Sequence, residues 1–142
     1  MRDVRIDRWA EILVNYSLQV QKGEHVVIVS EVEAKPLVEA CYEKFLQAGA
    51  IVEPILVFRE WSEIQFKYAT DEQLKTTMPL MRYAAENCDV YLYIGAETNS
   101  RLLANVDPKK QALVSQGRSP ILLWVKDTLR QETQIPLHCI GT

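Results

Sequence analysis

Polar and charged side chains follow three apolar runs of the chain, each at the point where a strand is expected to end. The runs begin at His25, Ile51 and Val90. The side chains that follow them are Glu31, Glu33, Arg59, Glu60, Glu97, Asn99 and Arg101. Ligands of open parallel sheets usually bind outside the carboxyl ends of the strands, so these positions are the first candidates for a functional site.

The chemistry that these residues suggest is the binding of a small polar ligand or a hard cation. Carboxylate oxygens are ligands that Mg²⁺ prefers, and a cluster of them would resemble the acidic pocket of a phospho-receiver domain. The alternative is a set of solvated loop carboxylates. Aspartates are missing from the ends of the runs that precede Glu31 and Glu97, which favours this alternative.

Other catalytic chemistries lack their sequence signatures. The five glycines are isolated and form neither a dinucleotide-binding nor a P-loop pattern, and no GxSxG elbow is present. Neither His25 nor His138 belongs to an HExxH motif. The three cysteines, Cys41, Cys88 and Cys139, are odd in number and widely separated, so we interpret them as buried thiols. These motifs alone therefore identify no catalytic residue and no metal ligand in this chain.

Four short apolar runs are the candidate strands of a sheet that would position these residues. They are residues 25–30, 51–58, 90–95 and 135–140. Pro54 and Pro136 each remove a backbone donor, so the second and fourth runs are expected at sheet edges, the second with a bulge as the other option.

Helical periodicity fills the intervals between the runs. Helices are expected over residues 6–21, 34–48 and 59–68, from a capping box at Thr70 and Gln73, from Pro79 to Asn87, from Asp107-Pro108, and afresh at Ser119-Pro120. Trp9, Trp61 and Trp124 fall on these helices at positions typical of a core. Alternating strands and helices predict a single three-layer α/β/α domain over residues 1–142, with a mostly parallel sheet of about four strands, Rossmann-like or flavodoxin-like.

Composition and charge exclude several classes of protein. The chain has 142 residues, 48% of them hydrophobic and 25% charged, with a formal net charge of −3, as is typical of a soluble globular domain. This charge gives no electrostatic attraction for nucleic acid, and no apolar run approaches the roughly 20 residues that cross a membrane. The first residues lack a signal peptide, so a cytoplasmic location is expected.

Four segments, taken in order, resemble the N-terminal domain of the thermophilic metallo-aminopeptidases, the aminopeptidase T and aminopeptidase S family. The segments are RWAEILVNYSLQVQKGEHVVIVS (8–30), EAKPLVEACYEKFLQAGA (33–50), CDVYLYIGAETNSRLLANVDPKK (88–110) and the stretch around residues 117–120. The part with most weight is Asn99 and Arg101, followed by Leu102-Leu103 and Val106-Asp107-Pro108.

The resemblance implies a hydrolase that removes N-terminal residues from peptides with divalent metal ions, Zn, Co or Mg. In that family the metal site belongs to a larger C-terminal domain, so no metal ligand is carried over to this chain. The N-terminal domain would form a wall over the metal site, with Glu31, Glu33, Glu97, Asn99 and Arg101 as candidates to face the cleft. The implied partners are a C-terminal catalytic domain, a peptide substrate and further copies of the chain.

Two other functions remain open at this point. The chain could be a stand-alone module that binds a small ligand, receiver-like and without catalytic activity, or a purely structural interaction domain. The acidic residues at the expected strand ends favour the first of these two.

Overall fold

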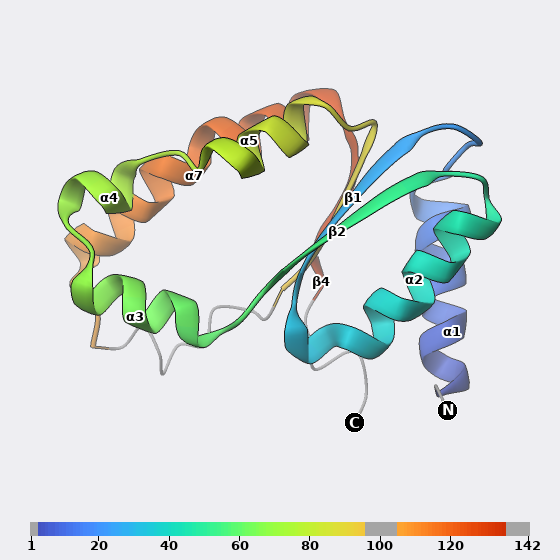
Figure 1. The fold of residues 1–142 in the computed structure, drawn as a ribbon, viewed down its shortest axis with the longest axis horizontal. Coiled ribbons are helices and arrows are strands. Elements are labelled where there is room, and N and C mark those ends of the chain that lie inside the picture. Colours follow the sequence, from blue (N-terminus) through green and yellow to red (C-terminus); the bar gives the residue numbers. More distant parts are fainter. Residues whose placement is uncertain (1–2, 96–104, 136–142) are drawn as a thin grey trace.

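The computed structural model describes residues 3–95 and 105–135. These residues form a four-stranded sheet at the centre of the fold (Figure 1). Its strands are β1 (His25–Glu31), β2 (Ile51–Val57), β3 (Val90–Ile94) and β4 (Arg130–Ile135). The spatial order is β2-β1-β3-β4, and every neighbouring pair is parallel. The first strand therefore lies inside the sheet, and the order changes direction between β1 and β3.

The helices form layers on the two faces of this sheet. They are α1 (Val4–Glu11), which continues as a π-helix (Ile12–Ser17), a 3₁₀ turn (Val32–Ala34), α2 (Lys35–Gln47), α3 (Glu60–Tyr68), α4 (Asp71–Lys75), α5 (Pro79–Glu86) and α7 (Pro108–Thr128). Figure 1 shows α1 and α2 on one side of the strands and α5 and α7 on the other. The predicted three-layer α/β/α class is confirmed.

Strict alternation along β1 divides its side chains between two cores. Val26 and Ile28 pack with Leu37 and Phe45 of α2, while Val27 and Val29 point to the other face. There they meet side chains of β3, α5 and α7, among them Tyr91, Ala85, Ile121 and Val125. Burial on both faces is why β1 is a continuous β-branched run rather than an alternating one.

Several local predictions are confirmed. β2 is an edge strand, and Pro54 pairs in register with Ile28 of β1. Thr70 and Gln73 form the capping box of α4, and α5 begins at Pro79 and ends with Asn87 as its C-cap. Edge strands and first helical turns tolerate a missing backbone donor or satisfy one with a side chain, so local sequence suffices to place them.

The prediction of a new helix at Pro120 is wrong, because α7 continues through this proline to Thr128. An internal proline costs a helix about 3 kcal/mol. Ile121 and Val125 lie on the buried side of α7, and burying two such side chains contributes about 1.5–3 kcal/mol each. The tertiary contacts of the second half therefore outweigh the local break.

Two further expectations need correction, and a third is described only in part. The first helix ends at Ser17 rather than near Gln21. The last strand lies over Arg130–Ile135, and most of the predicted 135–140 run is outside the described residues. Trp61 and Trp124 are not core residues, since 48% and 40% of their surfaces are exposed. Periodicity marks an apolar face of a helix but does not say whether this chain covers that face.

Candidate functional site

The carboxyl edge of the sheet brings Glu31 and Arg59 together. Glu31 is the last residue of β1 and follows Val27 and Val29 on the face that α5 and α7 share. Arg59 comes directly before α3, and its Nη2 lies 3.7 Å from Oε2 of Glu31. The neighbouring Ser30 is buried on the opposite face, where its hydroxyl donates to the Glu31 carbonyl at 2.9 Å.

Both members of this pair have a buried polar atom without a hydrogen bond. These atoms are Oε2 of Glu31 and Nε of Arg59. The 3.7 Å separation is too long for a hydrogen bond, so the pair attracts without satisfying either atom. A buried polar atom left unsatisfied costs about 1–3 kcal/mol. A molecule that donates to Glu31 and accepts from Arg59 would recover this cost, although both atoms are buried and it would reach them only after a local rearrangement.

Tyr93 of β3 is the aromatic neighbour of this edge. Burial raises the pKa of its phenol, Arg118 of α7 lowers it, and the Glu31 carboxylate raises it further. Gly95 follows β3, and a Cβ added there would lie 2.3 Å from Cε1 of Tyr93. A side chain at residue 95 would therefore require the Tyr93 ring to move. Glu31 and Tyr93 flank the place where the strand order reverses, the usual ligand position in such sheets.

The other residues predicted for the site have different outcomes. Glu33 is exposed in the 3₁₀ turn after β1, and Glu60 is exposed at the start of α3. The predicted residues of the loop after β3, Glu97, Asn99 and Arg101, lie outside the described residues. Of the candidates that can be located, Glu31 and Arg59 are the two in contact.

The described residues do not fit a divalent metal ion. Over residues 3–95 and 105–135, no three His, Cys, Asp or Glu side chains are close enough to hold one. The charged neighbour of Glu31 is a guanidinium, which would repel a cation. Within the same residues, no helix combines the length and apolar character needed to cross a membrane.

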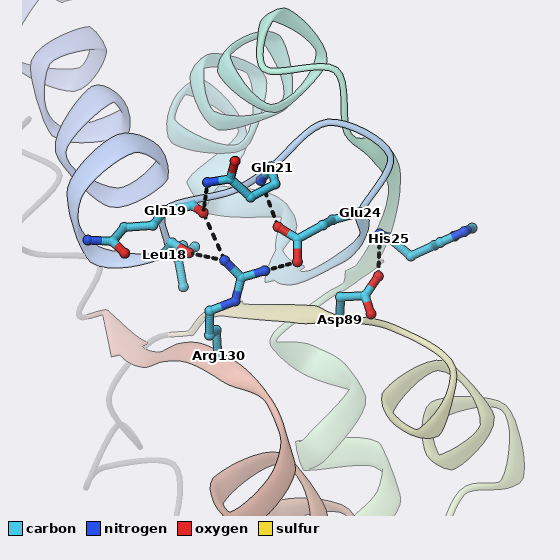
Figure 2. Close-up of polar contacts among 7 residues, drawn as sticks. All are labelled: Leu18, Gln19, Gln21, Glu24, His25, Asp89 and Arg130. Carbon is cyan, nitrogen blue, oxygen red and sulfur yellow. Dashed lines mark hydrogen bonds and ion pairs between the residues drawn. The ribbon is translucent and has the colours of Figure 1, made fainter.

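A polar network at the amino ends of the strands escaped sequence reasoning (Figure 2). The guanidinium of Arg130, at the start of β4, donates to the carbonyls of Leu18 and Gln19 at 2.9 and 2.8 Å, and it forms an ion pair with Glu24. Glu24 also accepts from the backbone N–H of Gln21 at 2.6 Å. We call this set the Arg130 clamp.

The clamp has a neighbour at the start of β1, where the His25 backbone N–H donates to Oδ2 of Asp89 at 2.9 Å (Figure 2). The contacts of Arg130 and the His25–Asp89 hydrogen bond join residues more than 60 positions apart, so local spacing in the sequence does not predict them. They hold the amino ends of β1, β3 and β4 together at the edge opposite Glu31. Their role is structural.

The two described cysteines are buried and free, as predicted. Burial raises the pKa of Cys41 to about 12 and is also the main cause that raises the pKa of Cys88 to about 11. Neither thiol ionises near neutral pH, which excludes both as nucleophiles. Cys139 lies outside the described residues.

A four-stranded parallel sheet with a reversal of strand order and helices on both faces defines a doubly wound α/β domain. Residues 2–135 match the thermophilic metalloprotease (M29) family, and the chain belongs to this family. The predicted family resemblance is therefore confirmed.

Two relatives show how much of a family member the chain represents. It is 29% identical over 127 residues to Aminopeptidase 2 of Geobacillus stearothermophilus, a match that covers 82% of this chain and 29% of the relative. Wild-type AmpT from Thermus thermophilus has the same fold, with a TM-score of 0.73 at 19% identity, over 90% of this chain and 34% of AmpT. The chain thus spans about a third of the length of these relatives.

Proposed function

We propose that this chain is a non-catalytic N-terminal domain of a metal-dependent aminopeptidase, an enzyme that removes N-terminal residues from peptides. The observation that carries the proposal is the family match over residues 2–135, together with a span of only 29% of Aminopeptidase 2. The metal ions, Zn, Co or Mg, would bind in a C-terminal domain, where they lower the pKa of a bound water and polarise the scissile carbonyl.

In this proposal the carboxyl edge of the sheet faces the substrate cleft. Glu31, Glu33, Glu97, Asn99 and Arg101 are the candidate residues on this side. The supporting observation is the pair of unsatisfied atoms on Glu31 and Arg59, which together offer one acceptor and one donor. The N-terminal end of a peptide carries an ammonium group that donates and a carbonyl oxygen that accepts, so it complements both atoms.

An activity assay tests the division of labour. The purified chain is incubated with a leucyl peptide and Co²⁺ or Zn²⁺, and Aminopeptidase 2 serves as the positive control. We expect no release of leucine from this chain. Metal-dependent release that follows the chain through every purification step would overturn the proposal.

The mass of the natural gene product provides the second test. Immunodetection followed by mass spectrometry is carried out on an extract of the source cells. A product about three times as long as the 142-residue chain is expected, in line with the share of the relatives that the chain covers. A product of 16.3 kDa would contradict the two-domain proposal.

The second candidate function is a stand-alone module that binds a small ligand at the same edge. It is favoured by the position of Glu31 beside the reversal of strand order and by its missing hydrogen bond. Under this alternative, a small ligand that donates to Glu31 and accepts from Arg59 raises the melting temperature, and Glu31→Gln removes the shift. An unchanged melting curve across a broad panel would exclude it. The cytoplasmic location expected from the sequence stays a prediction.

A further inference from the structure

Helix α7 passes through two different environments that meet at Pro120. After the proline, Ile121 and Val125 are buried in the apolar cluster on one face of the sheet. Before it, Gly117 lies so close to the end of α4 that an added Cβ would be 2.9 Å from the Thr76 carbonyl oxygen. The first half of α7 therefore packs on α4, and the second half packs on the sheet.

The first half of α7 joins α3 and α4 in a unit that lies apart from both cores of the sheet. Leu74 of α4 is buried, with 2% of its surface exposed, yet it belongs to neither of the two apolar clusters. Nζ of Lys110, at the start of α7, donates to the Phe66 carbonyl of α3 at 3.1 Å. We call residues 60–75 and 108–119 the arm. Figure 1 shows α3, α4 and the start of α7 at the end of the molecule opposite α1 and α2.

The described chain passes between the arm and the rest of the fold at three places, and each one interrupts regular helical hydrogen bonding. β2 leads into α3 through residues 58–59. α4 leads into α5 through residues 76–78, whose first and last members have extended backbone with ψ of 130° and 117°. The third place is Pro120, which has no N–H to donate to the Gln116 carbonyl four residues before it. These three places are therefore suited to act together as a hinge.

The ion pair of Glu31 and Arg59 joins the sheet to the base of the arm. Its charged groups are 3.7 Å apart, and Oε2 of Glu31 and Nε of Arg59 are buried without a hydrogen bond. No residue of α3, the helix that follows Arg59, is buried. Elements that bury little apolar surface move most readily. A movement of α3 that separates the pair would break no hydrogen bond between them and would let water reach both atoms.

We propose that the arm rotates as a unit about Pro120 and residues 58–59 and 76–78, and that this rotation separates Arg59 from Glu31. In the closed position, which the structure shows, the two unsatisfied atoms are buried. In the open position they face solvent, where a molecule that donates to the carboxylate and accepts from the guanidinium can reach them. The ion pair acts as the latch of this movement. The movement itself does not depend on the proposed function, and only its use for ligand access rests on it.

Pulsed electron paramagnetic resonance tests the movement by measuring the distance between two spin labels. The labels are attached to Glu63→Cys on the arm and to Glu39→Cys on α2, both at exposed positions. Cys139→Ser removes the cysteine outside the described residues, while Cys41 and Cys88 are buried and therefore protected from labelling. We expect two distances in this background, one for the closed position and one for the open position.

Pro120→Ala tests the hinge, because alanine supplies the missing donor to the Gln116 carbonyl. One restored backbone hydrogen bond should lower the population of the open distance by about fivefold. Pro108→Ala is the matched control, since Pro108 lies in the first turn of the same helix, where an N–H has no helical partner. It should leave the distance distribution unchanged. Equal distributions in the two variants would refute the hinge at Pro120.

Glu31→Gln tests the latch, because it removes the charge that attracts Arg59, and it should raise the population of the open distance. Glu72→Gln is its control, since it removes an exposed ion pair with Lys75 that lies within the arm at 2.8 Å. The control should change nothing. A single distance that persists in Glu31→Gln would overturn the proposal as a whole.

A ligand separates this inference from the proposed function. Leucinamide carries an ammonium group that donates and a carbonyl oxygen that accepts, so it should bind the separated pair and raise the population of the open distance. If the chain shows both distances but leucinamide leaves their populations unchanged, the movement is supported and its use for access to a peptide N-terminus is refuted.

Discussion

Removal of the Arg130 guanidinium should destabilise the fold far more than removal of a comparable surface arginine. Arg130→Ala deletes the donors to the Leu18 and Gln19 carbonyls and the ion pair with Glu24. A hydrogen bond to a charged group contributes about 1.5–3 kcal/mol. Because 40% of the Arg130 side chain is exposed, the lower end of this range applies, and the partly exposed ion pair adds less than about 1 kcal/mol. We expect a loss of about 2–3 kcal/mol in the free energy of unfolding.

Urea denaturation followed by circular dichroism measures this loss. Arg82→Ala is the control, because Arg82 forms a single exposed contact with Glu86 at 2.7 Å one helical turn away. Such pairs contribute about 0.3–0.5 kcal/mol. Arg130→Lys keeps the charge but loses the fork that reaches two carbonyls, so an intermediate loss is expected. The reasoning is refuted if Arg130→Ala and Arg82→Ala cost the same.

Three further substitutions test the buried thiol of Cys41 and the close contacts that an added Cβ would make at Gly117 and Gly95. Because the pKa of Cys41 is about 12 in the folded chain against 9.0 for the free group, the unfolded chain ionises first as the pH rises. When the pH rises from 8 to 10, Cys41 should therefore lower the free energy of unfolding by about 1.4 kcal/mol. Urea titrations at the two pH values should show that Cys41→Ala lacks this part of the decrease. A Cβ at Gly117 would lie 2.9 Å from the carbonyl oxygen of Thr76, so Gly117→Ala should cost about 1–3 kcal/mol by thermal denaturation. Gly95→Ala should cost a similar amount because its Cβ meets Tyr93.

Each of these three predictions has its own control. An alkaline loss of stability that is equal in Cys41→Ala and the wild type would contradict the first. Gln116→Ala is the control for Gly117→Ala, because Gln116 is the exposed neighbour of Gly117, and it should leave the melting temperature near the wild-type value. If Gly117→Ala also leaves the melting temperature unchanged, the close approach to Thr76 does not matter for stability. In the Tyr93→Ala background, Gly95→Ala should no longer destabilise, and a persistent loss would show that the ring is not the cause.

Local sequence predicts the elements of this fold well because strands and caps depend on neighbouring residues. The β-branched run from His25, the capping box at Thr70 and the break before Pro79 each follow from a few adjacent side chains. The α7 helix shows the limit of this reasoning. Pro120 predicts a break, yet the burial of Ile121 against the sheet keeps the helix continuous.

The candidate site was only partly predictable for the same reason. The end of β1 marks Glu31, and a residue directly after an apolar run is easy to find. That Arg59 pairs with it depends on β2 lying beside β1, which is a property of the strand order. The exposure of Trp61 depends on which segments cover α3, and periodicity cannot distinguish a face that is covered from one that is bare.

The inner position of β1 has a consequence for the order of events during synthesis. β2 follows β1 closely in the chain, so one edge of β1 can pair early. The other edge stays unpaired until β3 is synthesised, and His25 at the start of β1 and Asp89 just before β3 are 64 residues apart. At a translation rate of about 5–20 residues per second, that edge stays unpaired for about 3–13 s. An apolar strand edge left open for so long can pair with other nascent chains. The growing chain is therefore expected to be most prone to aggregation between the synthesis of β1 and that of β3.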